Sequence, residues 1–290
     1  MRGHAGLLML AGCGRIAFGD LAPDAASPFG PFGAPQPVSE LSSPDLDDDP
    51  TLSDDLLEML WTSTRSGSSG CDIWTSVRSD PAAQWPDPTN VAELNTTSCD
   101  SGASLAHDGK TLYLASTQLD PGNGLADVFI ATRSGRGSPW STPQLVSELT
   151  SPAQDGSPSL TTDERTGIMY SARNSGDDLF ESRRASAADL WTTPAVILEL
   201  TTTSRDRSPS VSADGLTIWF VSDRPGGLGL NDLYEASRPD LDSPFGAPVN
   251  LRELNTADSE DDPWVSPDGR TIFWAAKGPA GDSELFTATR

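Results

Sequence analysis

A short phrase occurs five times in this sequence: an acidic residue, an aliphatic residue, an aromatic residue and, four residues after the aromatic one, an arginine. The copies are DIWTSVR from Asp72, DVFIATR from Asp127, DLFESRR from Asp178, DLYEASR from Asp232 and ELFTATR from Glu284. An acidic turn residue precedes each copy, and these residues lie 53, 55, 51 and 54 positions apart: Asp55, Asp108, Asp163, Asp214 and Asp268. Self-similarity at such a period indicates a chain built from repeated structural units.

Each unit contains four short apolar segments bounded by turn residues, which is the pattern of β-strands. The first follows a proline position, the second is rich in aromatic residues, the third is the repeated phrase, and the fourth ends at a Glu-Leu pair. The content of 26 glycines and 24 prolines also favours an all-β chain. Four strands per unit predict one propeller blade per unit, and therefore an all-β, five-bladed β-propeller.

The stretch SVSADGLTIWFVSDRPGG from Ser210, followed by NDLYEASR, resembles the WD40-like propeller repeat of the TolB type. The resemblance extends over residues 32–290 and implies a protein of the bacterial envelope. TolB has six blades, whereas only five copies can be counted here.

The two ends of the repeat region complement each other. The segment SPFGPFGAPQPVSEL (Ser27–Leu41) matches SPFGAPVNLREL (Ser243–Leu254), which contains the fourth strand of its unit, whereas the fifth unit stops at its third strand. We therefore expect the N-terminal strand to complete the last blade and remove two exposed sheet edges.

The N-terminus has the features of an export signal. LAGC, which ends at Cys13, resembles the lipobox of bacterial lipoproteins. This predicts a signal peptide over residues 1–12, lipid on Cys13, a flexible tether over residues 13–31 and the propeller over residues 32–290. The resemblance implies anchoring to the outer membrane through the lipid alone, and leaves open whether the protein faces the periplasm or the outside.

The net charge of -23 disfavours binding to nucleic acid and to anionic lipid surfaces. A protein partner with a basic patch fits this charge. We expect a monomer that binds such a partner in the envelope.

One acidic position recurs three residues before the proline position: Asp47, Asp100, Asp155, Asp206 and Glu260. We expect these carboxylates to ring one mouth of the central channel. Two interpretations remain open. The acids either pair locally with cations that begin the loops between second and third strands (Arg65, Arg173, Arg224 and Lys277, with Gln118 as the exception), or form a collar that receives a basic partner or a divalent ion.

The remaining cysteines, Cys71 and Cys99, fall on the same predicted face of adjacent blades. An even pair in an oxidising compartment predicts a disulfide, and two free thiols are the alternative. The acid and arginine of the repeated phrase occur in every unit, which favours a structural role in joining blades.

The sequence contains no signal for catalysis. Of two histidines, His4 lies in the signal and His107 in a turn, so neither a His-based triad nor a metal cluster is expected. The loop RPGGLGLND is expected to be a hairpin rather than a phosphate loop. We expect no cofactor, beyond weak Ca²⁺ binding in PDLDDDP or SEDDP.

The prediction is a non-catalytic protein-interaction platform. The alternative is a carbohydrate-binding or glycoside-hydrolase-like propeller. No acid is expected to break the repeat on an inner strand; a carboxylate pair on two inner strands would favour the enzyme.

Overall fold

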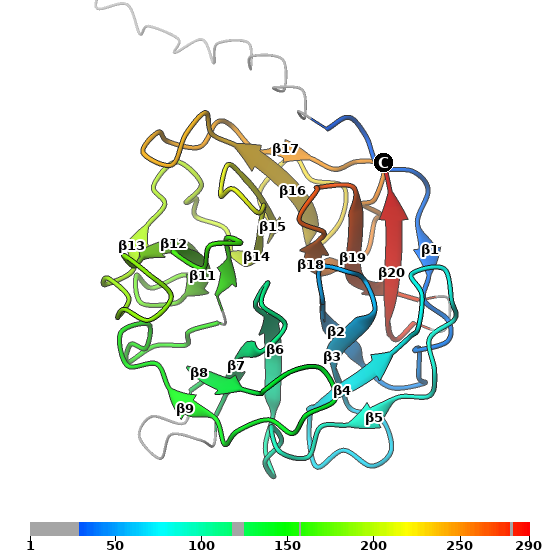
Figure 1. Cartoon of the computed structure of the whole chain (residues 1–290). Helices are drawn as coiled ribbons and strands as arrows, with labels where there is room; N and C mark the ends of the chain where they lie inside the picture. Colours follow the sequence, from blue (N-terminus) through cyan, green and yellow to red (C-terminus); the bar gives the residue numbers. More distant parts are fainter. Residues whose placement is uncertain (1–28, 118–124, 157, 279–280) are drawn as a thin grey trace, which may run out of the picture.

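The computed structural model describes residues 29–117, 125–156, 158–278 and 281–290. Five four-stranded antiparallel sheets are arranged around a common centre, as Figure 1 shows, so the predicted five-bladed propeller is confirmed. The predicted signal peptide, Cys13, His4 and most of the tether lie outside the described residues.

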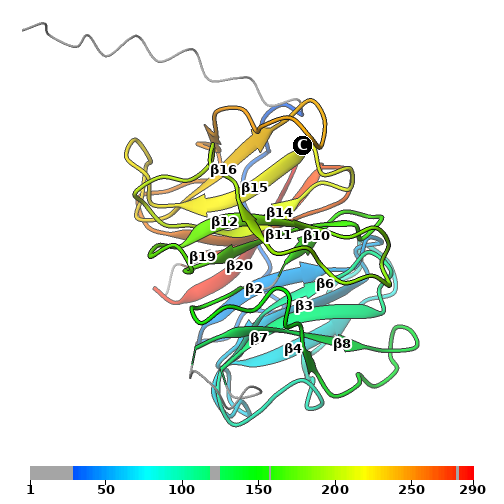
Figure 2. The same cartoon turned by 90° about the vertical axis from the view of Figure 1, so that its left-hand side faces the viewer.

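Each blade consists of strands in the order inner, second, third and outer. Figure 2 shows the ring from the side. The inner strands are β2 (Asp47–Leu52), β6 (Asp100–Leu105), β10 (Ser159–Leu160), β14 (Asp206–Val211) and β18 (Glu260–Val265). The second strands are β3 (Glu58–Ser63), β7 (Thr111–Ser116), β11 (Thr166–Ser171), β15 (Thr217–Ser222) and β19 (Thr271–Lys277). The third strands are β4 (Asp72–Val77), β8 (Asp127–Thr132), β12 (Asp178–Arg183), β16 (Asp232–Ser237) and β20 (Ser283–Thr289). The outer strands are β5 (Thr89–Asn90), β9 (Gln144–Leu145), β13 (Ala195–Val196), β17 (Val249–Asn250) and β1 (Gln36–Pro37).

The ring is closed by its two ends. β1 pairs antiparallel with β20, which places Gln36 opposite Thr287. The amide of Val38 extends this pairing by donating to the carbonyl of Leu285 at 2.8 Å. The predicted composite blade is therefore confirmed, and the last sheet has the order β1-β20-β19-β18.

The core lies between neighbouring sheets. Leu60 and Ile73 of the first blade, for example, pack with Leu112 and Leu114 of the second, and all four are fully buried. Because the aromatic-rich second strands supply such residues in every blade, the hydrophobic effect favours a complete ring over separate sheets.

In three blades the arginine of the repeated phrase is paired with the preceding blade. Arg133 stacks on Trp140 at 4.3 Å and forms an ion pair with Glu58 of the preceding blade at 2.5 Å. Corresponding pairs link Arg238 to Glu181 and Arg290 to Glu235. These contacts agree with the structural role that recurrence suggested.

Candidate functional site

The five recurrent acids do not form an exposed collar. They are buried, with at most 1% of the residue exposed: Asp47, Asp100, Asp155, Asp206 and Glu260. Four of them open inner strands rather than lying in the preceding connections. Asp155 instead forms an isolated bridge with Ser171.

Local partners hold these acids. Arg65 donates to Asp47 at 2.5 Å and to the carbonyl of Leu41 in the preceding connection at 2.6 Å. The same pairing joins Arg173 to Asp155 at 2.7 Å and Arg224 to Asp206 at 2.6 Å.

The other two acids have different partners. Asp100 accepts a bond from the hydroxyl of Ser116 at 2.6 Å, and Glu260 accepts one from Thr256 at the same distance. Lys277 instead contacts Asp258 at 3.2 Å, while Gln118 lies outside the described residues. The arrangement matches the local-pairing interpretation, because a partner could reach these carboxylates only by displacing the connections that cover them.

The cavity at the centre of the ring is lined instead by the residues that follow each acid. We call it the axial pocket, and its volume is about 250 Å³. All five blades contribute to it, through Asp48, Asp49, Ser101, Gly102, Ala115, Gly156, Tyr170, Arg207, Ser208, Asp261 and Asp262. A smaller cavity of about 80 Å³ shares several of these residues and is also lined by Ser159 and Trp264.

The repeat breaks in this pocket. The two residues after the recurrent acid are Asp-Asp in blades 1 and 5, Ser-Gly in blade 2, Gly-Ser in blade 3 and Arg-Ser in blade 4. The expectation that no acid breaks the repeat on an inner strand is therefore wrong. The signal was present in the sequence, since aligning the units between the acid and the proline position reveals the difference.

A bulge turns these side chains toward the centre. The strand register shifts after the second residue in β2, β6, β14 and β18. The third residue has a left-handed backbone, with φ of 50° at Asp49, 49° at Ser208 and 52° at Asp262. Left-handed non-glycine residues carry strain, and such strain recurs at functional sites. Here the bulge also has a structural use, because it recurs in blades with different side chains.

Three of the carboxyls lie close together. Asp262 interacts with both Asp48 and Asp49 across the junction of the last and first blades. Burial, together with the neighbouring Asp49 charge, raises the pKa of Asp48 to about 7. Burial and the Asp262 charge raise the pKa of Asp49 to the same value. Burial and the Asp48 charge raise the pKa of Asp262 well above its ordinary value of 3.8. The cluster therefore retains protons near neutral pH.

Little positive charge compensates for this cluster. Arg207 lies 3.8 Å from Asp261 and is the only basic residue among those that line the described pocket. Burial nevertheless raises the pKa of Asp261, although Arg207 opposes the shift. Four carboxyl groups and one guanidinium leave the pocket with an excess of acid.

Tyr170 enters the pocket beside Gly156 of blade 3, which has no side chain. A Cβ on Gly156 would lie 2.0 Å from the Tyr170 ring, so only glycine leaves room for the ring. The hydroxyl of Tyr170 accepts a bond from Gln154 at 3.1 Å, and burial raises its pKa to about 12. It remains a neutral hydroxyl at the wall of an acidic cavity.

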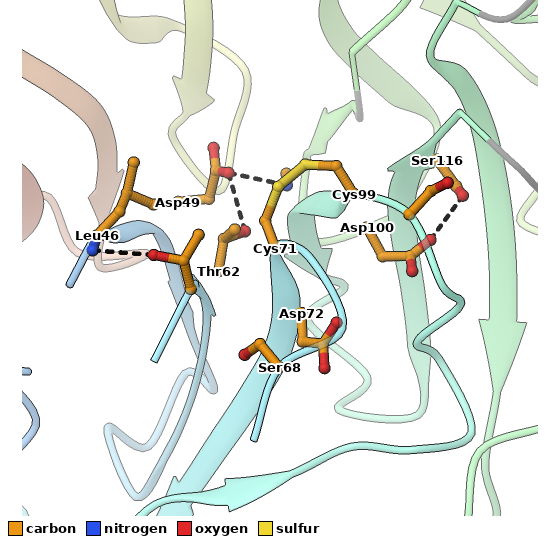
Figure 3. Close-up of a disulfide and its surroundings, with 12 residues drawn as sticks. Leu46, Asp49, Thr62, Ser68, Cys71, Asp72, Cys99, Asp100 and Ser116 are labelled. Carbon is orange, nitrogen blue, oxygen red and sulfur yellow. Dashed lines mark hydrogen bonds between the residues drawn. A yellow bond between two sulfur atoms is a disulfide. The ribbon is translucent and has the colours of Figure 1, made fainter. Parts of the chain in front are cut away.

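The predicted disulfide is present between Cys71 and Cys99, whose Cα atoms are 4.4 Å apart. Figure 3 shows it beside Asp49, which bonds to Thr62, and Asp100, which bonds to Ser116. The amide of Asp100 also donates to the carbonyl of Cys71 at 2.8 Å. The disulfide thus fixes the start of inner strand β6 to blade 1.

No group of three or more His, Cys, Asp or Glu side chains in the described ranges has an arrangement suited to a metal ion. The weak Ca²⁺ binding expected in the Asp-rich segments stays a prediction. Within the same ranges, no helix is long and apolar enough to span a membrane.

Two kinds of solved structure resemble this fold. A putative TolB from Agrobacterium tumefaciens has a TM-score of 0.54 at 15% identity, over 88% of this chain and 89% of that one. TolB from Acinetobacter baumannii has a TM-score of 0.51 at 17% identity, over 87% of this chain and 56% of that one. The α-L-arabinofuranosidase PaAbf62A from Podospora anserina, in complex with cellotriose, has a TM-score of 0.57 at 12% identity, over 84% of this chain and 90% of that one.

No protein-family model and no curated protein matches the sequence. The likeness to the solved structures shows the propeller fold alone. TolB proteins and glycoside hydrolases share that fold, so function must be argued from the axial pocket.

Proposed function

We propose that the protein is a non-catalytic binding propeller whose axial pocket receives a cationic group of an envelope protein partner. The carboxyl cluster of Asp48, Asp49 and Asp262 carries the proposal. The Asp-Asp pair that supplies these acids occurs in only two of the five blades, whereas residues that recur in every blade serve the fold.

A cation suits this cluster on electrostatic grounds. Desolvation and the repulsion between neighbouring carboxylates disfavour the ionised forms, which is why the pKa values of Asp48 and Asp262 are raised. An ammonium or guanidinium group placed among them would favour the ionised forms and displace the retained protons. Binding would therefore release protons near neutral pH.

The proximity of the carboxyls argues against hydrolysis as the first choice. Glycosidases commonly hold two carboxyl groups roughly 5–9.5 Å apart, on either side of the bond to be broken. Asp262 instead lies close enough to Asp48 and Asp49 for the three carboxyls to shift one another's pKa values.

Carbohydrate binding or hydrolysis is the second candidate. Inward carboxylates on β2 and β18 fulfil the condition that would favour the enzyme, and Tyr170 adds a hydroxyl to the pocket. Arabinofuranosidases share the fold. A ligand that separated Asp262 from Asp48 would be needed for this function.

Location in the envelope is part of the proposal. Lipid on Cys13 would anchor a monomeric propeller to the outer membrane, with the pocket free for a partner. Labelling with radioactive palmitate, compared between the wild type and Cys13→Ser, tests the anchor. Incorporation into both proteins or neither would contradict it.

The binding test is a crosslinking pull-down from solubilised envelopes with the wild type and Asp48→Asn/Asp262→Asn. The matched control is Asp87→Asn/Glu93→Gln, which removes two exposed acids outside the pocket. We expect the pocket variant to lose, and the control to retain, the captured partner. Equal capture by all three folded proteins would contradict the proposal. A glycan array with the same proteins tests the second candidate, which requires sugar binding that only the pocket variant loses.

A further inference from the structure

His107 connects three blades. It lies in the turn between β6 and β7, where its Nδ1 is 2.7 Å from a carboxylate oxygen of Asp54 in the turn between β2 and β3. Its Nε2 is 2.9 Å from the carbonyl oxygen of Leu160 on β10. The side chain is only 15% exposed.

Both partners of the ring are acceptors. A carbonyl oxygen cannot donate, and an ionised carboxylate cannot donate either. A neutral imidazole carries one N–H and could satisfy only one of these two contacts, whereas imidazolium carries two. The observed geometry therefore requires the charged form of His107.

We infer that His107 is a proton-operated clamp that holds blades 1, 2 and 3 together on this face and releases one of its two contacts when it loses its proton. This inference goes beyond the proposed function and does not depend on it.

The charged groups around the ring favour the proton. Asp54 from blade 1 contacts it directly, Glu164 lies in the β10–β11 turn of blade 3, and Asp108 is its neighbour in the chain. Glu164 is itself paired with Arg184 at 3.3 Å. Burial alone would lower the pKa of His107, but the bonds to Asp54 and Leu160 and the attraction of Glu164 raise it above 6.5.

The clamp holds a strand that lines the smaller cavity. Leu160 is the second of only two residues in β10, and the other, Ser159, lines the smaller cavity below the axial pocket. The hydroxyl of Ser159 in turn accepts a bond from the amide of Val211 in blade 4 at 3.0 Å. Loss of the proton would therefore loosen the shortest inner strand of the ring.

Nuclear magnetic resonance of the imidazole nitrogens tests the charge state. The chain has two histidines, and His107→Gln assigns their signals. We expect both nitrogens of His107 to be protonated at pH 6, with a midpoint above 6.5. A single neutral tautomer at pH 6, or a midpoint at or below 6.5, would overturn the inference.

Amide hydrogen exchange tests the clamp itself. Comparing the wild type with His107→Gln at each pH removes the intrinsic pH dependence of exchange and the contribution of the axial carboxyls. We expect residues 159–161 to be better protected in the wild type below the midpoint, and equally protected in both proteins above it. Asp54→Asn should lower the midpoint. A protection difference that is independent of pH would mean that the imidazole only packs, and would also overturn the inference.

Discussion

In the proposed function, Asp262 helps to bind a cation, but its ionised carboxyl lowers the stability of the folded protein. Its carboxyl lies near other carboxyls that raise its pKa, and a hydroxyl from Ser208 is its main compensating donor. The left-handed backbone at this position suits aspartate or asparagine better than other non-glycine residues. Asparagine can therefore replace it without new backbone strain.

Asp262→Asn should stabilise the protein at pH 8 and not at pH 4. The folded-state pKa of Asp262 is raised, so the folded protein binds more protons than the unfolded chain above pH 3.8, and stability falls as pH rises. Removing the ionisable group removes this loss. We expect the free energy of unfolding to increase at pH 8, because the ionised carboxyl is disfavoured in the folded protein. Urea unfolding at both pH values measures it, with Asp87→Asn as the control. A loss of stability at pH 8 would show that the carboxyl is stabilised by its surroundings.

Gly156→Ala should destabilise the protein through Tyr170. The added Cβ would overlap the ring, so the ring must leave the pocket wall, at a cost of roughly 1–3 kcal/mol. A double-mutant cycle with Tyr170→Ala measures the coupling, because Ala at position 156 should cost little once the ring is gone. Additive effects of the two substitutions would contradict this account.

At the scale of elements, the strands and their order were predictable, because the repeated phrase and the aromatic segments recur with strand periodicity. The outer strands are shorter than their sequence suggests, with only two paired residues each. The axial pocket was not predicted. Recurrence drew attention to Asp47 and its equivalents, which are structural, whereas the functional candidates are the neighbouring positions that differ between units.

The disulfide should stabilise the junction of the first two blades. Cys71 and Cys99 close a loop with a sequence separation of 28, for which loop entropy predicts roughly 3–4 kcal/mol. We expect Cys71→Ser/Cys99→Ser to lose about this much in denaturant unfolding. Reductant should weaken the wild type but leave the variant unchanged. Two titratable thiols at these positions in the native, unreduced protein would contradict the bond.

At the scale of the whole molecule, closure by β1 completes a ring that brings residues from all five blades to one cavity. The recurrent strands form the ring, and the two residues after each recurrent acid, which differ between blades, line the axial pocket. The net charge of -23 would attract cationic partners from a distance, while the axial pocket would distinguish among them.

The most direct test is calorimetric titration with an oligolysine peptide at physiological salt, in two buffers of different ionisation enthalpy. We predict binding to the wild type with release of protons near pH 7, and loss of both in Asp48→Asn/Asp262→Asn. The Asp87→Asn/Glu93→Gln control should bind and release protons as the wild type does. Equal binding by all three proteins, without proton release, would mean that the peptide senses only the net charge, and would contradict the axial pocket as the binding site.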